Sequence, residues 1–179
     1  IESYIERESV DKAFKEALTD GNEVIVYGSS KQGKTSLILN NLQESLYVKV
    51  ECSPQTQPID IYKSILRQIG IKFIESESTE EKYEHGGKAS AGFRIKIPFI
   101  GDTAATAEIS DKALSGITTK ETYVEYNLEL AQDVSEILKQ NKIKKYLILE
   151  NFHYLTLEVQ EALAYDLRVF QDQGIIFII

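Results

Sequence analysis

Several residue types are scarce in this chain of 179 residues, and each scarcity excludes something. The sequence has no methionine, no tryptophan, three prolines and a single cysteine, Cys52. One cysteine cannot form an internal disulfide, and such usage fits the reducing cytosol. We therefore expect a cytoplasmic protein in which Cys52 is a small core residue. No apolar run reaches the ~20 residues needed to span a bilayer and no signal peptide begins the sequence, so no membrane association is predicted.

Positive charge is also scarce, because 20 Lys and Arg residues stand against 28 Asp and Glu residues and the formal net charge is −8. Non-specific nucleic-acid binding usually requires a basic face. The one locally basic stretch, 139–145, is better explained as a helix end whose cations lie at the negative pole of the helix dipole. This segment is therefore a poor candidate for nucleic-acid binding.

The two ends of the sequence suggest a fragment. The chain begins at Ile1 without a methionine and stops inside 174–179, an apolar stretch that resembles a strand with no turn after it. Its length and its hydrophobic content of 42% suffice for one domain with a substantial core. We therefore expect residues 1–179 to be the N-terminal part of a larger domain.

One short motif carries most of the functional information. Residues 28–35 read Gly-Ser-Ser-Lys-Gln-Gly-Lys-Thr and fit G-x-x-x-x-G-K-[ST], the phosphate-binding P-loop. A short apolar, β-branched segment at 23–27 precedes the motif, and a segment of helical character at 36–42 follows it. Strand, glycine loop and helix in this order are the context that the motif requires. The sequence therefore predicts nucleotide binding.

The residue types of the loop match the chemistry of phosphate binding. Backbone N–H groups form a nest for phosphate oxygens, and the helix N-terminus adds partial positive charge. Lys34 is expected to reach the β- and γ-phosphates, and the Thr35 hydroxyl is expected to join the Mg²⁺ shell. The predicted phosphate-binding residues are Gly28, Ser29, Ser30, Lys31, Gln32, Gly33, Lys34, Thr35 and Ser36.

Helical and strand patterns alternate along most of the chain. A helix is expected after Ser9, a predicted N-cap, and should end at Gly21. Further strands are predicted at 46–50, 146–149 and 175–179, and further helices at 59–69, 121–140 and 156–172. Such alternation implies right-handed crossovers and a parallel sheet with helices on both faces. We predict an α/β fold of the three-layer P-loop NTPase class.

Residues 75–120 interrupt this alternation. The stretch 75–81 is acidic, 93–97 alternates apolar and basic residues as a half-exposed strand does, and 98–102 resembles a turn. Residues 103–110 are the expected return strand. We predict an inserted β-hairpin that serves as a structural flap or binds a neighbouring protomer or a partner.

The second half of the nucleotide site is expected at the end of strand 146–149. A P-loop protein needs an acidic residue at the end of another strand to hold Mg²⁺ through water, and a neighbouring glutamate can polarise the attacking water. Glu150 has the first of these positions. We predict that Glu150 and Thr35 form the Mg²⁺ side of the site; the alternative is a strand-end carboxylate in solvent.

Three segments together resemble a known family. Residues 4–8 (Tyr-Ile-Glu-Arg-Glu), the P-loop and residues 149–155 are similar to the AAA+ and STAND ATPases, and most closely to the initiator-like branch that includes origin-recognition ATPases. The resemblance covers 4–70 and 121–179. It implies ATP and Mg²⁺ as ligands, with Arg7 near the adenine. It also implies that the last strand lies between the P-loop strand and the acidic strand, with the sensor, lid and arginine finger beyond the fragment.

The same resemblance identifies a departure from the family pattern. It places Glu150 on the Mg²⁺-side aspartate of the pattern, Asn151 on the catalytic glutamate and His153 on a second aspartate. An amide can orient water but cannot accept its proton, so ATP hydrolysis is expected to be slow or to use Glu150 or His153 as the base. Lys34, Glu150 and Asn151 are the predicted catalytic residues.

The resemblance implies a nucleotide-dependent oligomerising switch or motor. ATP would hold a homo-oligomer assembled through the ATPase domain, acting on a partner effector in bacterial anti-phage defence or signalling. Three alternatives remain open. The first is an initiator or helicase-loader ATPase with a DNA-binding module downstream, and the second is a hydrolysis-deficient ATP-binding scaffold. The third is a P-loop kinase, whose lid usually carries arginines, whereas residues 75–120 contain only Arg94. ATP is preferred over GTP by resemblance, and no Asn-Lys-x-Asp motif for guanine is present.

Overall fold

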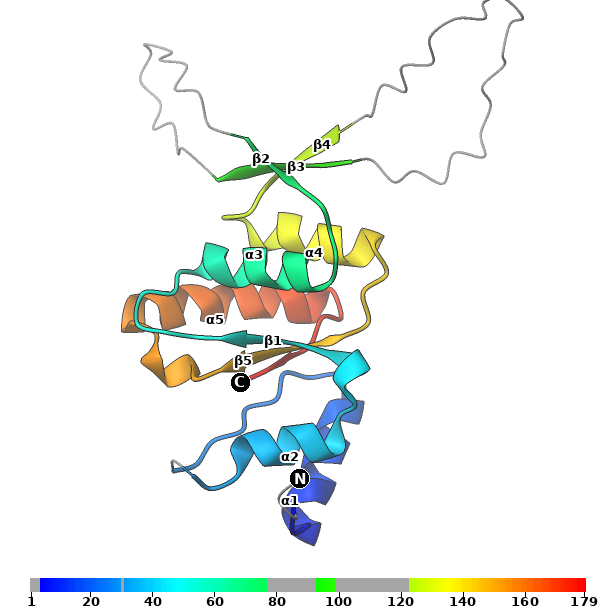
Figure 1. The fold of residues 1–179 in the computed structure, drawn as a ribbon, viewed down its shortest axis with the longest axis vertical. Helices are drawn as coiled ribbons and strands as arrows, with labels where there is room; N and C mark the ends of the chain where they lie inside the picture. Colours follow the sequence, from blue (N-terminus) through cyan, green and yellow to red (C-terminus); the bar gives the residue numbers. More distant parts are fainter. Residues whose placement is uncertain (1–3, 30, 77–92, 99–122) are drawn as a thin grey trace, which may run out of the picture.

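The computed structural model describes residues 4–29, 31–76, 93–98 and 123–179. They form an α/β protein with a small parallel sheet and a separate antiparallel sheet (Figure 1). The parallel sheet has the order β1 (Tyr47–Glu51), β5 (Tyr146–Glu150) and β6 (Phe177–Ile178), and the antiparallel sheet has the order β2 (Ile74–Ser76), β3 (Arg94–Pro98) and β4 (Tyr123–Asn127). The predicted α/β class with a parallel sheet is confirmed.

Helices cover both faces of the parallel sheet (Figure 1). One face carries α1 (Glu8–Thr19) and α2 (Lys34–Asn41), and the other carries α3 (Pro58–Gln68), α4 (Ala131–Gln140) and α5 (Leu157–Asp172). Two short 3₁₀ turns, η1 (Glu44–Leu46) and η2 (Phe152–Tyr154), precede β1 and follow β5. These bounds lie within one or two residues of the predicted ones for α3, α5, β1 and β5.

The segment before the P-loop motif lies at the edge of the parallel sheet. Val24 forms a parallel bridge with Ile178, and Val26 N donates to Ile179 O at 2.7 Å. The spatial order is therefore β1, β5, β6 and then this segment, as the resemblance implies. The prediction of a buried strand at 23–27 is wrong in part, because Val24 is buried whereas Ile25 and Tyr27 are 69% and 91% exposed. At the sheet edge only one side of the segment is covered, by α1 and α2.

Two predicted helix starts need correction. Helix α1 begins at Glu8 and its N-cap is Arg7, not Ser9. The cap is supplied from within the helix, because the Asp11 carboxylate accepts a hydrogen bond from Arg7 N at 2.9 Å. That carboxylate also accepts from Tyr4 Oη and from Asn41 Nδ2, both at 2.7 Å, which joins the N-terminal segment and α2.

The predicted helix 121–140 begins too early. Residues 123–127 form β4, which pairs with β3, and the helix starts at Ala131. These residues form a strand because the buried Tyr126 pairs with the buried Ile95 of β3, which fits the alternation of side chains in a strand. The Asp133 carboxylate then accepts a hydrogen bond from Asn127 N at 2.7 Å where the strand turns into the helix. Pairing with β3 has overridden a weak helical pattern.

The predicted strand at 93–97 is confirmed as β3, although its partners differ from the expected ones. Within the described part of the chain it pairs antiparallel with β2 and β4. The expected return strand 103–110, most of the turn 98–102 and residues 77–81 of the acidic run lie outside the described residues. The small sheet lies over α3 and α4 (Figure 1), and Ile95 and Ile97 join the apolar core there.

The apolar residues of the core are distributed unequally over the two faces of the parallel sheet. The larger cluster joins the sheet to α3, α4 and α5, with Tyr62, Phe170 and Phe177 in successive ring contacts. Cys52 belongs to this cluster at 2% exposure, as predicted, and burial raises the pKa of its thiol to about 11. Among the described residues, no helix has the length and apolar character to cross a membrane.

Candidate functional site

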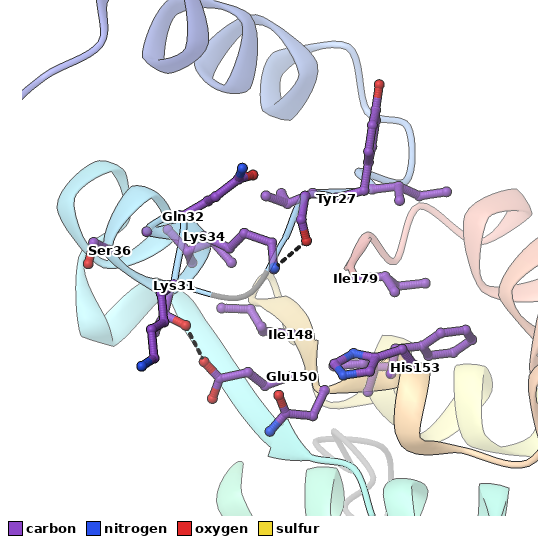
Figure 2. Close-up of a pocket in the computed structure, with 18 of the residues that line it drawn as sticks. Tyr27, Lys31, Gln32, Lys34, Ser36, Ile148, Glu150, His153 and Ile179 are labelled. Carbon is purple, nitrogen blue, oxygen red and sulfur yellow. Dashed lines mark hydrogen bonds between the residues drawn. The ribbon is translucent and has the colours of Figure 1, made fainter.

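A cavity of about 840 Å³ lies where the glycine loop faces the end of β5 (Figure 2). Its walls come from 25–28, from 31–36 and Ile38, from 148–154 and from Ile179. Ligand pockets usually measure roughly 300–1,000 Å³, so this one is large enough for a nucleotide. It lies at the carboxyl ends of parallel strands, where open α/β sheets bind their ligands.

Two glycines of the loop have positive φ angles, which glycine adopts without strain. Gly33 has φ 78° and caps α2, and Gly28 has φ 153°, where a Cβ would lie 2.5 Å from Gln32 Oε1. The Gln32 amide oxygen instead accepts a hydrogen bond from Ser29 N at 3.0 Å. One loop amide is therefore satisfied by a side chain that a phosphate oxygen could replace. Ser30, also predicted for this loop, lies outside the described residues.

The Lys34 side chain folds back over the loop. Its ammonium group donates to Gly28 O at 2.7 Å (Figure 2). It also donates to Ser29 O at 3.0 Å. Both acceptors are neutral carbonyl oxygens, whereas a phosphate oxygen carries negative charge and adds a Coulomb attraction to the hydrogen bond. A phosphate placed in the cavity would therefore compete well for this ammonium group.

Thr35 and Glu150 meet across the cavity although 115 positions separate them in the sequence. Thr35 Oγ1 donates to Glu150 Oε1 at 2.7 Å. Thr35 lies in the first turn of α2, and Glu150 is the last residue of β5. These are the two residues predicted to hold Mg²⁺, and the fold brings their oxygens into direct contact.

Sequence reasoning missed a cation beside Glu150. Lys49 of β1 places its ammonium group 2.9 Å from Glu150 Oε2, so both carboxylate oxygens have a partner. Burial raises the pKa of Glu150, but the hydrogen bonds from Lys49 and Thr35 and the charge of Lys49 outweigh it, leaving the pKa below its ordinary value. The hydrogen bond to Glu150 in turn raises the pKa of Lys49. Glu150 is therefore ionised at neutral pH.

The oxygen atoms of Thr35 and Glu150 are suitable ligands for a magnesium ion that also binds a phosphate group. A hydroxyl and a carboxylate are hard oxygen ligands, which Mg²⁺ prefers, and Mg²⁺ usually keeps several waters and takes further ligands from substrate phosphates. The described residues contain no group of three or more His, Cys, Asp or Glu side chains that could hold a metal ion. The donor set therefore fits a cation that arrives with a phosphate ligand.

Asn151 and His153 both line the cavity on the side of β5. Asn151 has φ 60°, a left-handed conformation that asparagine adopts more readily than most residues. Its Nδ2 donates to Glu51 Oε1 of β1 at 3.4 Å, and Glu51 is a second residue that sequence reasoning missed. The His153 ring lies against Tyr154, with centroids 4.3 Å apart. No described contact joins His153 to Glu150.

Other predicted site residues lie around the loop. Lys31, Gln32 and Ser36 line the cavity, whereas Ser29 is not one of its lining residues. Arg7 contacts the loop from outside, since its guanidinium donates to Gln32 O at 3.2 Å. The sequence indicated this contact only through the basic residue Arg7 in the N-terminal segment.

Neither protein-family models, nor curated proteins, nor solved structures give a match to this chain. Function must therefore be inferred from the residues that line the cavity and from their contacts.

Proposed function

We propose that this chain is the nucleotide-binding part of a P-loop ATPase of the AAA+ and STAND type, binding ATP with Mg²⁺ in the cavity between the glycine loop and β5. One observation carries the proposal. Thr35, which follows the loop lysine Lys34, lies 2.7 Å from Glu150, the acidic residue at the end of a buried parallel strand. A chance match to the motif on an ordinary turn gives no reason for this long-range contact.

Phosphate binding follows from the groups that surround the loop. The N–H groups at the start of α2 and the partial positive charge of its N-terminus attract the β- and γ-phosphates. Lys34 exchanges two carbonyl acceptors for phosphate oxygens. Mg²⁺ bound with the nucleotide would neutralise part of the phosphate charge, and Thr35 and Glu150 are the residues that would hold it.

The strand order also supports the proposal. The segment before the loop lies beside β6, and β6 lies beside β5, so the acidic strand is two places from the loop strand. This is the order that the family resemblance implies. The buried Cys52 agrees with a protein of the reducing cytoplasm, where ATP is available.

Asn151 shapes the kind of ATPase that is proposed. An amide at this position favours slow turnover, and slow turnover suits a switch in which bound ATP holds an oligomer together until hydrolysis releases it. Such a switch would act on a partner effector, and bacterial anti-phage defence or signalling is the setting that the resemblance suggests. The same amide supports a second candidate, a scaffold that binds ATP without hydrolysing it.

Equilibrium titration of the full chain with a fluorescent ATP analogue and Mg²⁺ tests the proposal. Lys34→Ala should weaken binding by about tenfold or more, because it removes a charge-assisted bond to phosphate worth roughly 1.5–3 kcal/mol. Lys12→Ala is the matched control, since this lysine is exposed on α1 and its ion pair within the described part of the chain is with Glu16, one turn further along the same helix. A wild-type chain that fails to bind the nucleotide, or a Lys34→Ala variant that binds equally well, would show the proposal to be wrong.

Light scattering of the full-length protein separates a switch from a simple binder. A switch should gain mass when ATP is added, and Lys34→Ala should abolish the gain. An unchanged mass with bound ATP would remove the oligomerising part of the proposal and leave nucleotide binding in place.

A further inference from the structure

The ends of two neighbouring strands bring a second carboxylate to the site. β1 and β5 pair in parallel with Glu51 opposite Glu150, and each is the last residue of its strand. Parallel strands present their carboxyl ends at the same edge of a sheet, so Glu51 lies at the edge where the cavity is, next to its lining residues but not one of them. No motif in the sequence marks Glu51, because its position depends on the register of a long-range pair.

Asn151 connects Glu51 to the cavity. The Asn151 side chain is part of the cavity wall, and its Nδ2 donates to Glu51 Oε1 at 3.4 Å. Glu51 Oε2 has no hydrogen-bond partner among the described residues, and the side chain is exposed. One oxygen of Glu51 is therefore held by the amide while the other is available to a water molecule.

Glu150 is poorly suited to accept a proton. Its Oε1 accepts from Thr35 and its Oε2 contacts the Lys49 ammonium group, so both carboxylate oxygens are engaged. Such a carboxylate must give up one of these contacts before it can take a proton from water. Among the described residues, Glu51 has no hydrogen bond to Thr35 or Lys49, and its one side-chain hydrogen bond comes from Asn151.

We propose that Glu51 is the proton acceptor for ATP hydrolysis at this site and that Asn151 holds it in place. This inference rests on the proposed ATPase function. The water oxygen bonds to the γ-phosphorus as the bond from that phosphorus to the β–γ bridging oxygen breaks. ADP leaves with the electron pair, and the water proton passes to Glu51 and then to the released phosphate or to solvent. Asn151 orients the same water through its amide oxygen.

The proposal gives Asn151 a reason for being an amide. Its N–H group can donate to the Glu51 carboxylate, which a second carboxylate at position 151 would repel. Glu51 on β1 then accepts the proton and Asn151 after β5 orients the water, whereas a single glutamate after β5 would do both. Hydrolysis then requires no glutamate at position 151.

Single-turnover phosphate release from Mg²⁺-ATP by the full chain tests the role of Glu51. Glu51→Gln keeps the size of the side chain and an oxygen that accepts from Asn151, and it removes only the proton acceptor. General bases contribute roughly 10²–10⁴-fold, so the rate should fall about 100-fold or more while the affinity for ATP changes less than about threefold. Glu44→Gln, an exposed carboxylate before β1, is the matched control and should keep the wild-type rate.

Three outcomes distinguish this inference from the function on which it rests. A Glu51→Gln rate within about threefold of the wild type overturns the role of Glu51. A wild-type chain that binds ATP but releases no phosphate also overturns it, and leaves ATP binding intact. A wild-type chain that binds no ATP overturns both proposals.

Glu51→Asp distinguishes proton acceptance from a structural role. It keeps a carboxylate on a shorter side chain and should retain at least about tenfold more activity than Glu51→Gln. Equal rates in the two variants, both folded by circular dichroism, would overturn the proposal, because the size of the side chain rather than its basicity would then govern the rate.

Discussion

The two faces of the parallel sheet are built differently. The face covered by α3, α4 and α5 belongs to a cluster of 24 buried residues, whereas the face covered by α1 and α2 belongs to a cluster of eight. The face covered by α1 and α2, called the thinner face below, carries the polar contacts of Lys34, Thr35 and Glu150 in the cavity. The larger apolar cluster therefore lies on one face and the proposed ligand site on the other.

Core truncations on the two faces should show the largest difference. Ile65→Ala in α3 removes a side chain with 0% exposure from the larger cluster and should lower the free energy of unfolding by about 3–5 kcal/mol. Leu37→Ala in α2 should cost less, about 2–3 kcal/mol, because the smaller cluster can relax around it. Urea denaturation measures both. Equal costs would break the comparison, and the exposed Leu157→Ala serves as the control.

Acid should weaken the thinner face through Asp11. Hydrogen bonds from Asn41, then from Tyr4 and Arg7, hold the pKa of this buried carboxyl group below its ordinary value despite the opposing effect of burial. Its contribution to stability is therefore full above the ordinary value near 3.8 and is lost as the pH falls through the lower pKa of the folded state.

The melting temperature at pH 7 and near pH 3 measures this effect. Asp11→Asn should start from a lower melting temperature at pH 7 and lose less of it on acidification than the wild type. Asp20→Asn, just after α1, is the control. Parallel losses in the wild type and Asp11→Asn would show that Asp11 does not carry the acid response.

The smallest expected effect concerns the cation beside Glu150. Lys49→Met frees Glu150 Oε2, so less Mg²⁺ should be needed to support nucleotide binding. A partly exposed ion pair is worth about 0.2–1 kcal/mol, which corresponds to a decrease of at most about fivefold in the half-saturating Mg²⁺ concentration. Lys63→Met breaks an ion pair of similar length, 3.1 Å to Glu75, on the other side of the sheet and should leave the Mg²⁺ requirement unchanged. An equal shift in both variants would contradict the role of Lys49.

Secondary structure was predicted correctly from the sequence wherever the apolar pattern of a single segment determines it. The strands at β1 and β5 and the helices α3 and α5 follow from short apolar patterns, and the loop conformation at Gly33 follows from its motif. Prediction was wrong at 121–140, where the first residues pair with β3 as β4, because the partner strand lies about 30 positions away. The prediction of Ser9 as the N-cap was wrong for a local reason, since the helix begins one turn from Asp11, whose carboxylate accepts a hydrogen bond from the N-cap residue Arg7.

The sequence alone determined the glycine loop, the apolar strand that ends in Glu150 and the alternation of strands and helices. Tertiary structure alone decided which side chains surround Glu150. Lys49 contacts Glu150, and Glu51 contacts the next residue, Asn151, because β1 pairs with β5 in one particular register, about 100 positions apart. Register is fixed when whole apolar faces are buried together, and no short stretch of sequence contains that information.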